Sequence, residues 1–476
     1  MVKINTDLLI IGGGSAGFGA SLNALKTVKG NINITLIEKN NTLGGTSTLA
    51  GVNCWEPGVG GLGIHHEIAE KLLINPSDAG VGKVKVPPND ERPWAISQID
   101  RREDYESTLR RSGIDQINWR RFNFEAAAMS KIMYKMLSSY ENIDILFNTE
   151  FISSEVRDGN IDYVYAVDRN NGITYKIYAK LYIDSSADII LARDCGCRFS
   201  FGEDAAVTYN EPSAPQKANK IINAITLLFR VQPSAINHVD PISNEFKDFD
   251  VSAWLENNVY NYKLLSLINE YPNGDLNINM LPTMEGAEYI SLEKAEALHI
   301  CKARVFHYWH WLQKEKGMSC YTFKEFFPMV GVRETYRLIG QYVLNENDIR
   351  AGFLNQKQKE EIIAFGDHAL DTHGKTNVKG IRCGELEKPY GVPFRCLLTN
   401  EVENLLVACR GGSFSHIAAS SCRLSRSMMA LGEAAGTAAV MALEGNKLPG
   451  NIDVGLLRSL LAIPAFEEKI IKRWRL

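Results

Sequence analysis

The segment DLLIIGGGSAG, residues 7–17, decides the fold of this chain. Its apolar strand runs into Gly12, Gly14 and Gly17, which have the spacing G-x-G-x-x-G, and a helical stretch follows over residues 18–26. The first glycine permits a tight turn, the second lets a phosphate approach the backbone, and the third lets helix and strand pack closely. Free N–H groups at the start of the helix would then face the phosphates of a dinucleotide.

A second strand, INITLIEKN at residues 32–40, completes a β-α-β unit. Glu38 stands at its end, about 20 residues beyond Gly17, where an acid accepts the ribose hydroxyls of a dinucleotide. Strand, glycine turn, helix and acid together therefore predict a dinucleotide site. Residues 58–63 repeat the glycine spacing, but no strand precedes them and no acid follows at the right distance, which favours a flexible loop there.

Composition narrows the class of protein. The chain has 476 residues, enough for two domains, and its 45% hydrophobic and 23% charged residues are typical of a soluble globular protein. A net charge of -4 offers no attraction to nucleic acid, and no apolar stretch reaches the roughly 20 residues that span a bilayer. No secretory leader is visible, so we expect a cytoplasmic protein. Nine scattered cysteines without a CxxC pair argue against a disulfide scaffold or a metal site.

The middle of the chain differs from its two ends in composition and in its predicted helices and strands. A proline-rich connection, the strand-like ITLLFRVQ and a long aromatic helix ending at Gly317 occupy residues 206–334. Strand, glycine-rich loop and long helix then return and would pack onto the first unit. We expect an α/β protein with a discontinuous Rossmann-like domain, residues 1–205 and 335–476, and an inserted α+β substrate or cap domain, residues 206–334.

Spacing alone does not distinguish NAD from FAD, because both contain a pyrophosphate. The segments EKNNTLGGTST, TEFISSEVRDGNIDYVYAV and YIDSSADIILARDCGC resemble FAD-binding segments of the glutathione-reductase superfamily. In the third, Ser185, Ser186 and Ala187 replace the Ala, Thr and Gly of the usual Asp-Ala-Thr-Gly-Asp motif. Because Ala187 adds a side chain where the usual motif has glycine, it could prevent the backbone from approaching the cofactor closely at that point.

Four later segments resemble the broad bacterial FAD-dependent oxidoreductase family, some members of which are labelled xanthan lyase. They are MVGVRETYRLIGQYVLNENDI, FGDHALDTHG, KPYGVPFR and NLLVACRGGSFSHIAASSCRLSRSMMALGEAAGTAA. The resemblance implies FAD as cofactor and a fold of the glutathione-reductase type. It also implies that residues 410–416 lie by the isoalloxazine and that a helix from about Ser420 to Leu443 points its N-terminus at the pyrimidine edge. Gly432 and Gly436 suit close packing of that helix.

The glycine motif and the resemblance together imply one set of FAD-binding residues. It comprises Gly12, Gly14, Ser15, Ala16, Gly17, Glu38, Lys39, Gly44, Gly45, Thr46, Ser47, Phe151, Ser185, Ser186, Ala187, Asp188, Arg410, Gly411, Gly412 and Ser420.

Acid–base candidates are His373, His416, Arg333 and Arg395, all within the family-like segments. A histidine near flavin could take a substrate proton, and an arginine could hold a carboxylate. We expect His373, with Asp371 nearby in sequence, to be the base, while His416 positions flavin or substrate.

Structural alternatives stand beside these roles. Asp367 and Asp371, at i and i+4, would share one face of a helix, and Arg333 with Glu334 would form a salt bridge. The aromatic residues around 307–310 favour a packed helix.

The leading functional hypothesis is hydride exchange between FAD and a small polar organic substrate, such as a carbohydrate or hydroxy acid. No second dinucleotide fingerprint and no CxxxxC disulfide accompany the flavin site, so the electron acceptor or donor is left open. Two alternatives are an RNA-modifying flavoprotein, which the acidic balance opposes, and a polysaccharide lyase, which the flavin motifs do not require. We expect no nucleic-acid or membrane partner, and the sequence leaves the oligomeric state undetermined.

Overall fold

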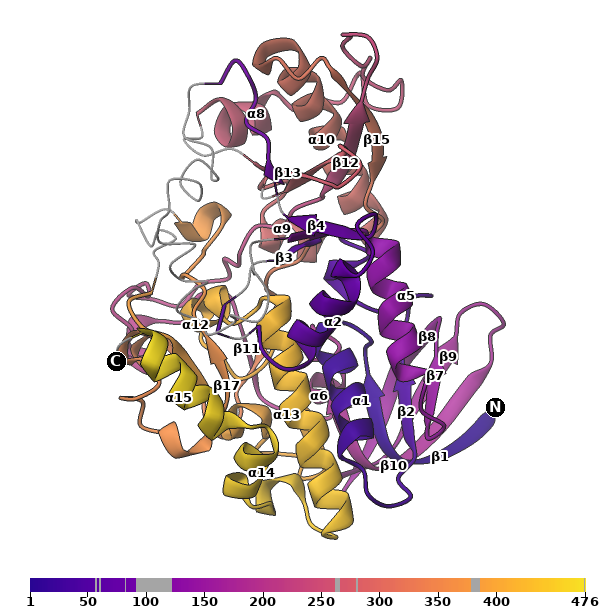
Figure 1. Ribbon diagram of the computed structural model, residues 1–476, viewed down its shortest axis with the longest axis vertical. Coiled ribbons are helices and arrows are strands. Elements are labelled where there is room, and N and C mark those ends of the chain that lie inside the picture. Colours follow the sequence, from indigo (N-terminus) through magenta and orange to yellow (C-terminus); the bar gives the residue numbers. More distant parts are fainter. Residues whose placement is uncertain are drawn as a thin grey trace.

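The computed structural model describes residues 1–55, 58–59, 61–81, 83–90, 122–261, 266–279, 281–377, 386–474 and 476. Figure 1 shows a larger α/β part and a smaller part made of a sheet with a long helix. The larger part is built on a seven-stranded sheet of order β7-β2-β1-β10-β9-β8, in which β19 also pairs with β10. The strands are β1 (Val2–Ile11), β2 (Ile34–Ile37), β7 (Ile143–Leu146), β8 (Thr149–Arg157), β9 (Asn160–Asp168), β10 (Thr174–Asp184) and β19 (Leu405–Val407).

The parallel and antiparallel halves of this sheet follow from their sequences. β7, β2, β1, β10 and β19 run parallel, and the apolar end of β1, residues 8–11, is buried, as expected for a strand covered on both faces. β8 and β9 form an antiparallel hairpin. Asp158 and Gly159 at its turn have φ values of 49° and 74°, the pair of positive angles that a tight two-residue hairpin needs.

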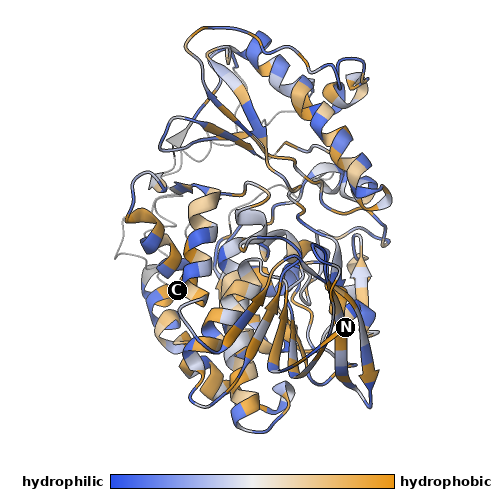
Figure 2. Cartoon of the chain, turned by 90° about the vertical axis from the view of Figure 1, so that its right-hand side faces the viewer, coloured by the Kyte–Doolittle hydropathy of each residue, from blue (hydrophilic) through white to orange (hydrophobic). Residues whose placement is uncertain are grey.

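Helices α1 (Ser15–Thr27), α5 (Ala126–Leu137) and α13 (Ser425–Glu444) cover one face of the sheet (Figure 1). Figure 2 shows the strands beneath them mainly in apolar colours. A Cβ at Gly432 would lie 2.0 Å from the Ala16 carbonyl oxygen, and one at Gly436 would lie 2.2 Å from that of Ala20. The close packing predicted for the two glycines is confirmed.

The long helix predicted from about Ser420 to Leu443 is present as α13, but its predicted start is wrong. The chain forms α12 (His416–Ser421), leaves the helical path at residues 422–424, and starts α13 at Ser425. The break has a local consequence, because it turns Arg423 so that its guanidinium donates to the carboxylate of Asp371 at 2.7 Å.

The smaller part is an antiparallel sheet of order β15-β12-β14-β13-β5 with one long helix, α10 (Lys294–Lys316), on one face. Its strands are β5 (Lys83–Val84), β12 (Phe229–Pro233), β13 (Leu267–Glu270), β14 (Leu276–Asn279) and β15 (Tyr321–Phe326). α10 ends at Gly317, whose φ of 77° allows the left-handed C-cap. We call this part, with its connecting loops, the cap. β5 comes from outside the stretch 206–334, a contribution that the sequence did not predict.

Polar contacts fix the cap to the larger part. Arg230 on β12 pairs with Glu125 at 2.7 and 2.9 Å and with Asp275 at 2.6 Å. Asn277 on β14 donates to the Gly51 carbonyl at 2.9 Å. Arg230 and Asn277 are directly opposite each other on paired strands, so they share one face of the sheet. That face therefore points toward the larger part.

Shorter elements connect these parts. They are β3 (Cys54–Trp55), α2 (Ile64–Leu73), β4 (Ala79–Val81), β6 (Phe122–Phe124), α6 (Ile190–Asp194), β11 (Phe199–Phe201), α7 (Ala206–Tyr209), α8 (Ser252–Leu255), α9 (Gly286–Ser291), β16 (Tyr336–Leu338), α11 (Glu346–Ala351), β17 (Ile362–Gly366), β18 (Tyr390–Pro393), α14 (Val454–Leu460) and α15 (Ile463–Trp474). Within the described ranges, no helix is both long and apolar enough to cross a bilayer.

Candidate functional site

The glycine turn after β1 has one crowded side and one open side. A Cβ at Gly12 would lie 2.7 Å from the Ser185 carbonyl oxygen, and one at Gly17 would lie 1.7 Å from that of Gly12. A Cβ at Gly14 would meet nothing within 4 Å. The open side therefore exposes the backbone of Gly14 and the first N–H groups of α1, which is the arrangement that a pyrophosphate requires.

Two further segments lie against this turn. Glu38 follows β2 and accepts from Gly13 N–H at 2.6 Å and from Asn40 N–H at 2.8 Å. Gly44 donates its N–H to the Gly13 carbonyl at 2.9 Å. Ser47, at the end of the second segment, hydrogen-bonds to Ser425 at 2.9 Å, which links it to the first residue of α13.

Helices α1 and α13 aim their N-termini at the same edge of the sheet. Asn23 Nδ2 donates to Thr437 Oγ1 at 2.6 Å, and Lys29 N donates to Glu444 Oε1 at 2.8 Å, so the helices run parallel with an offset of 414 or 415 residues. Ser425 therefore lies four or five residues before the level of Ser15, which places the start of α13 about 6–8 Å beyond that of α1. Two positive helix ends at staggered depths suit an elongated anionic cofactor.

The segment 184–188 completes the turn from the other side. Ala187 adopts a φ of 70°, the left-handed conformation that glycine takes freely, so the replacement of Gly by Ala does not prevent the turn. Ser185 Oγ is buried without a hydrogen-bond partner in the described chain, and the Ser185 side chain reaches within 3.3 Å of where a Gly17 Cβ would lie. Asp188 is held by Arg410 at 2.6 Å and by Thr335 at 2.7 Å.

The remaining residues of the implied FAD set occupy varied places. Phe151 lies on β8 with its backbone opposite Ala166, and Lys39 is exposed. Gly411 packs so closely that a Cβ there would lie 2.7 Å from the Tyr336 carbonyl oxygen. Ser420 lies inside α12, where its hydroxyl donates to the Ile417 carbonyl at 2.7 Å. Ser420 therefore does not start the long helix.

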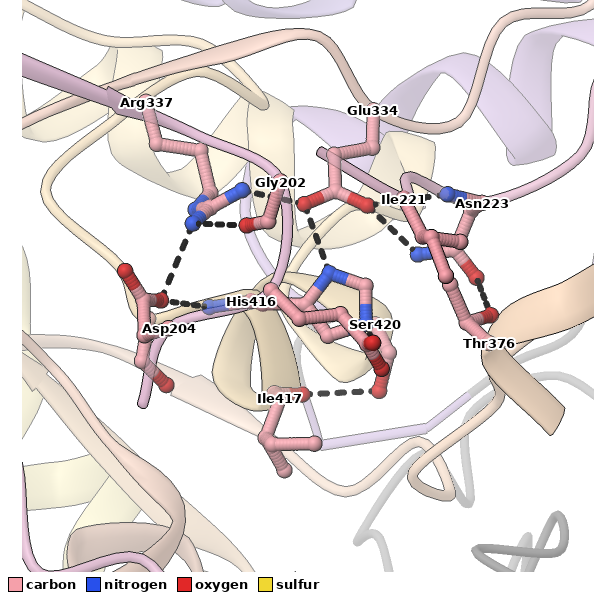
Figure 3. Close-up of polar contacts among 12 residues, drawn as sticks. Gly202, Asp204, Ile221, Asn223, Glu334, Arg337, Thr376, His416, Ile417 and Ser420 are labelled. Atoms are coloured by element: carbon pink, nitrogen blue, oxygen red, sulfur yellow. Dashed lines mark hydrogen bonds and ion pairs between the residues drawn. The ribbon is translucent and has the colours of Figure 1, made fainter. Parts of the chain in front are cut away.

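A buried polar network surrounds His416 (Figure 3). His416 Nδ1 lies 2.8 Å from Glu334 Oε1, and the His416 backbone N–H donates to Asp204 at 2.8 Å. Arg337 pairs with both Glu334 and Asp204. Burial alone would raise the pKa of Glu334, but the charges of His416 and Arg337 lower it to about 2. Glu334 is therefore ionised and can only accept hydrogen bonds.

Asn223 joins this network to His373. Asn223 donates to Glu334 from its backbone N–H at 3.1 Å and from its side chain at 2.8 Å. Its side-chain oxygen accepts the His373 backbone N–H at 2.8 Å. The segment around His373 and the segment around His416 thus meet through one buried amide, although they are well separated in the sequence.

His373 has its own carboxylate. Its Nε2 lies 2.8 Å from Asp371, which Arg423 also contacts. Burial and the charge of Arg333 lower the pKa of His373 to about 4. Burial alone would raise the pKa of Asp371, but the charges and hydrogen bonds of His373 and Arg423 lower it below the ordinary value. The pair therefore holds a neutral imidazole beside an ionised carboxylate at neutral pH.

The two arginines singled out from the sequence are placed differently. Arg333 donates to the Ala224 carbonyl at 2.8 Å and to Thr226 at 2.9 Å, both at the start of the cap. Its neighbour Glu334 pairs with Arg337, so the expected Arg333–Glu334 bridge is wrong. Arg395 is half-exposed and forms an ion pair with Glu361 at 3.0 Å.

The stretch 367–373 is not a helix, so the alternative of a helix face for Asp367 and Asp371 is wrong. Asp367 instead forms a buried ion pair with Arg426 at 2.9 Å. The packed aromatic helix is confirmed, since His307 and His310 on α10 hydrogen-bond to the carbonyls of Phe246 and Asp240.

These features define a Rossmann-type dinucleotide-binding protein, in which a glycine turn, an acid after the second strand and two helix N-termini face one site. A family model described as FAD dependent oxidoreductase matches residues 7–461, and the chain belongs to this family. The protein is therefore an FAD-dependent oxidoreductase. No curated protein matches the chain.

Three solved proteins are similar to the chain at low identity. A geranylgeranyl bacteriochlorophyll reductase-like protein from Thermoplasma acidophilum is 11% identical, with a TM-score of 0.47 over 99% of this chain and 86% of that one. The myxobacterial chondrochloren halogenase CndH is 11% identical, with a TM-score of 0.43 over 99% and 79%. The p-nitrophenol 4-monooxygenase PnpA from Pseudomonas putida is 10% identical, with a TM-score of 0.40 over 99% and 84%.

Sequence reasoning missed Asn223, Asp204 and Arg337. Each is a polar residue of an ordinary type, and only the buried contacts with Glu334 and His416 show its place. Arg337 alone had a signal, because it lies within the family-like segment 329–349.

Proposed function

We propose that the protein exchanges a hydride between FAD and a small polar organic substrate, such as a carbohydrate or a hydroxy acid. The observation that carries the proposal is the buried network that joins His416, Glu334 and Asn223 to His373, beside the start of α13. Bound FAD supplies the two-electron hydride chemistry. The chain must then orient the substrate and move its proton, and clustered histidines with ionised carboxylates are suited to that task.

The residues that would hold FAD are those of the glycine turn, Glu38, the segment 44–47 and the segment 185–188. We propose an arrangement of the glutathione-reductase type, with the adenosine near Glu38 and the flavin near α12 and α13. The open side of Gly14 and the unpartnered Ser185 Oγ support this fit. The cofactor then extends from the turn toward the histidine network.

The stretch 206–334 would supply substrate selectivity. Asn223 and Arg333 both come from it, and the polar face of its sheet points toward the larger part. Arg333 contributes a positive charge beside His373, which favours an anionic or strongly polar substrate group there.

The proposal is tested by anaerobic reduction of the bound flavin. D-glucose, myo-inositol, L-lactate and glycerol are mixed separately with the FAD-loaded protein, and loss of the flavin absorbance is followed. We expect at least one of them to bleach the flavin and to be released as the carbonyl compound. Bleaching by dithionite without bleaching by any organic compound in this screen contradicts the proposal.

A further inference from the structure

The His373–Asp371 and His416–Glu334 pairs differ in which ring nitrogen faces the carboxylate. In His373, Nε2 faces Asp371 at 2.8 Å. In His416, Nδ1 faces Glu334 at 2.8 Å, while Nε2 is buried without a hydrogen bond within the described part of the chain. The nearest carboxylate oxygen to that nitrogen, on Glu203, is 3.8 Å away, beyond hydrogen-bonding distance.

The state of the His416 ring follows from its partner. Glu334 is ionised and only accepts, so Nδ1 must carry a proton, and the neutral form of the ring has its lone pair on Nε2. Glu334 is itself fixed by Arg337 and by two N–H groups of Asn223. A flip of the ring would therefore break the Nδ1 hydrogen bond to a carboxylate that is itself held in place.

A buried acceptor without a donor is destabilising, so its presence at Nε2 needs a reason. The geometry points to His416 Nε2 as the group that accepts the proton of a substrate hydroxyl, with Glu334 as its positioning residue. This inference rests on the proposed function and narrows its substrate class to compounds with a carbinol, a carbon that bears both a hydrogen and a hydroxyl.

The step balances. The carbinol C–H bond breaks and its hydrogen leaves with two electrons to oxidised FAD, the O–H bond breaks and its proton binds Nε2, and a C=O bond forms. His416 becomes an imidazolium with Glu334 on one side and Glu203 on the other, and both carboxylates stabilise the positive charge. Arg337 and Asp204, the other charged groups that contact His416 or Glu334, are paired with each other at 2.9 Å.

His416→Asn is the decisive variant. Asparagine can still donate to Glu334 from the position of Nδ1, but it has no atom at Nε2. In the FAD-loaded protein we expect unchanged FAD content and melting temperature, with anaerobic flavin reduction slowed about 10² to 10⁴ fold, the usual loss for a general base. His299→Asn is the matched control, because His299 is exposed on α10 and contacts Glu245 and nearby aromatic rings.

The outcomes separate the inference from the proposed function. Normal reduction in His416→Asn, with loss in His373→Asn, overturns the inference and leaves the function standing. A second readout needs no substrate, because nitrogen NMR of the FAD-loaded protein labelled with ¹⁵N-histidine reports which ring nitrogen is protonated. We expect one signal set with a protonated Nδ1 and a bare Nε2 that disappears in His416→Asn. A protonated Nε2 in that set overturns the inference even if no compound bleaches the flavin.

Discussion

The glycine turn of the larger part and the Asp240 cluster of the cap are both densely bonded, but by opposite means. The turn is held by backbone atoms so close together that Gly12 and Gly17 leave no space for a side chain. In the cap, one carboxylate accepts hydrogen bonds from five groups, which belong to His238, Trp309, Gln313, Thr322 and Phe323. The shape of the glycine turn therefore depends on the absence of side chains, whereas the structure of the cap depends on one carboxylate side chain.

The largest expected effect on stability is at Gly17, whereas a substitution at Gly14 in the same turn should affect FAD binding alone. Gly17→Ala places a Cβ 1.7 Å from a carbonyl oxygen and should destabilise the fold by on the order of 4 kcal/mol or more, with loss of FAD. Gly14→Val should fold, because nothing in the described part of the chain meets a Cβ there, yet it should lose FAD because the phosphate cannot approach. Circular dichroism and flavin content decide the matter, and a folded Gly14→Val with full FAD contradicts the site.

Asp240→Ala should destabilise the cap without changing the glycine turn. Removing the carboxylate leaves several donors unpaired around α10 and β15, so we expect a loss of about 3 kcal/mol of stability. Because the glycine turn is untouched, the FAD content of the surviving folded protein should stay at one per chain. Denaturant unfolding measures the first quantity and absorbance the second. A parallel loss of flavin would show that the two regions are held by a common network.

Glu433 on α13 tests whether a buried acid weakens the helix layer. Burial raises its pKa to about 7, while the Ile64 N–H and Lys26 oppose the rise. A folded-state pKa above the unfolded value of about 4.3 means that stability falls as pH rises from about 4 through 7. Glu433→Gln should therefore stabilise the protein by about 3 kcal/mol at pH 8 and by little at pH 4. Urea unfolding at the two pH values checks this, and an equal effect at both would refute it.

The smallest effect concerns Ala187, which holds a left-handed φ of 70°. Ala187→Gly should remove about 1 kcal/mol of backbone strain at that position, offset in part by the greater freedom of glycine in the unfolded chain. We expect a small rise in melting temperature with unchanged FAD content. A fall would show that the alanine methyl contributes packing that exceeds the strain.

The dinucleotide site could be predicted from the sequence because it is formed by residues that are close together in the chain. A strand, three glycines at fixed spacing and an acid at the end of the next strand follow one another between Asp7 and Glu38, and each has one dominant structural consequence. The turn at Asp158 and Gly159 and the C-cap at Gly317 were predictable for the same reason, since both need a residue that tolerates positive φ.

Only the tertiary structure decided the candidate catalytic site. From the sequence, Asp371 made His373 the first choice as base, because a nearby carboxylate is visible in the chain. The partner of His416 is Glu334, far away in the sequence, and the amide that links the two histidines comes from the start of the cap. Burial decides which nitrogen is left without a partner, and burial depends on segments that meet only after folding. The sequence therefore predicted a dinucleotide site between Asp7 and Glu38, whereas the packing of distant segments decided which histidine nitrogen lacks a partner in the described part of the chain.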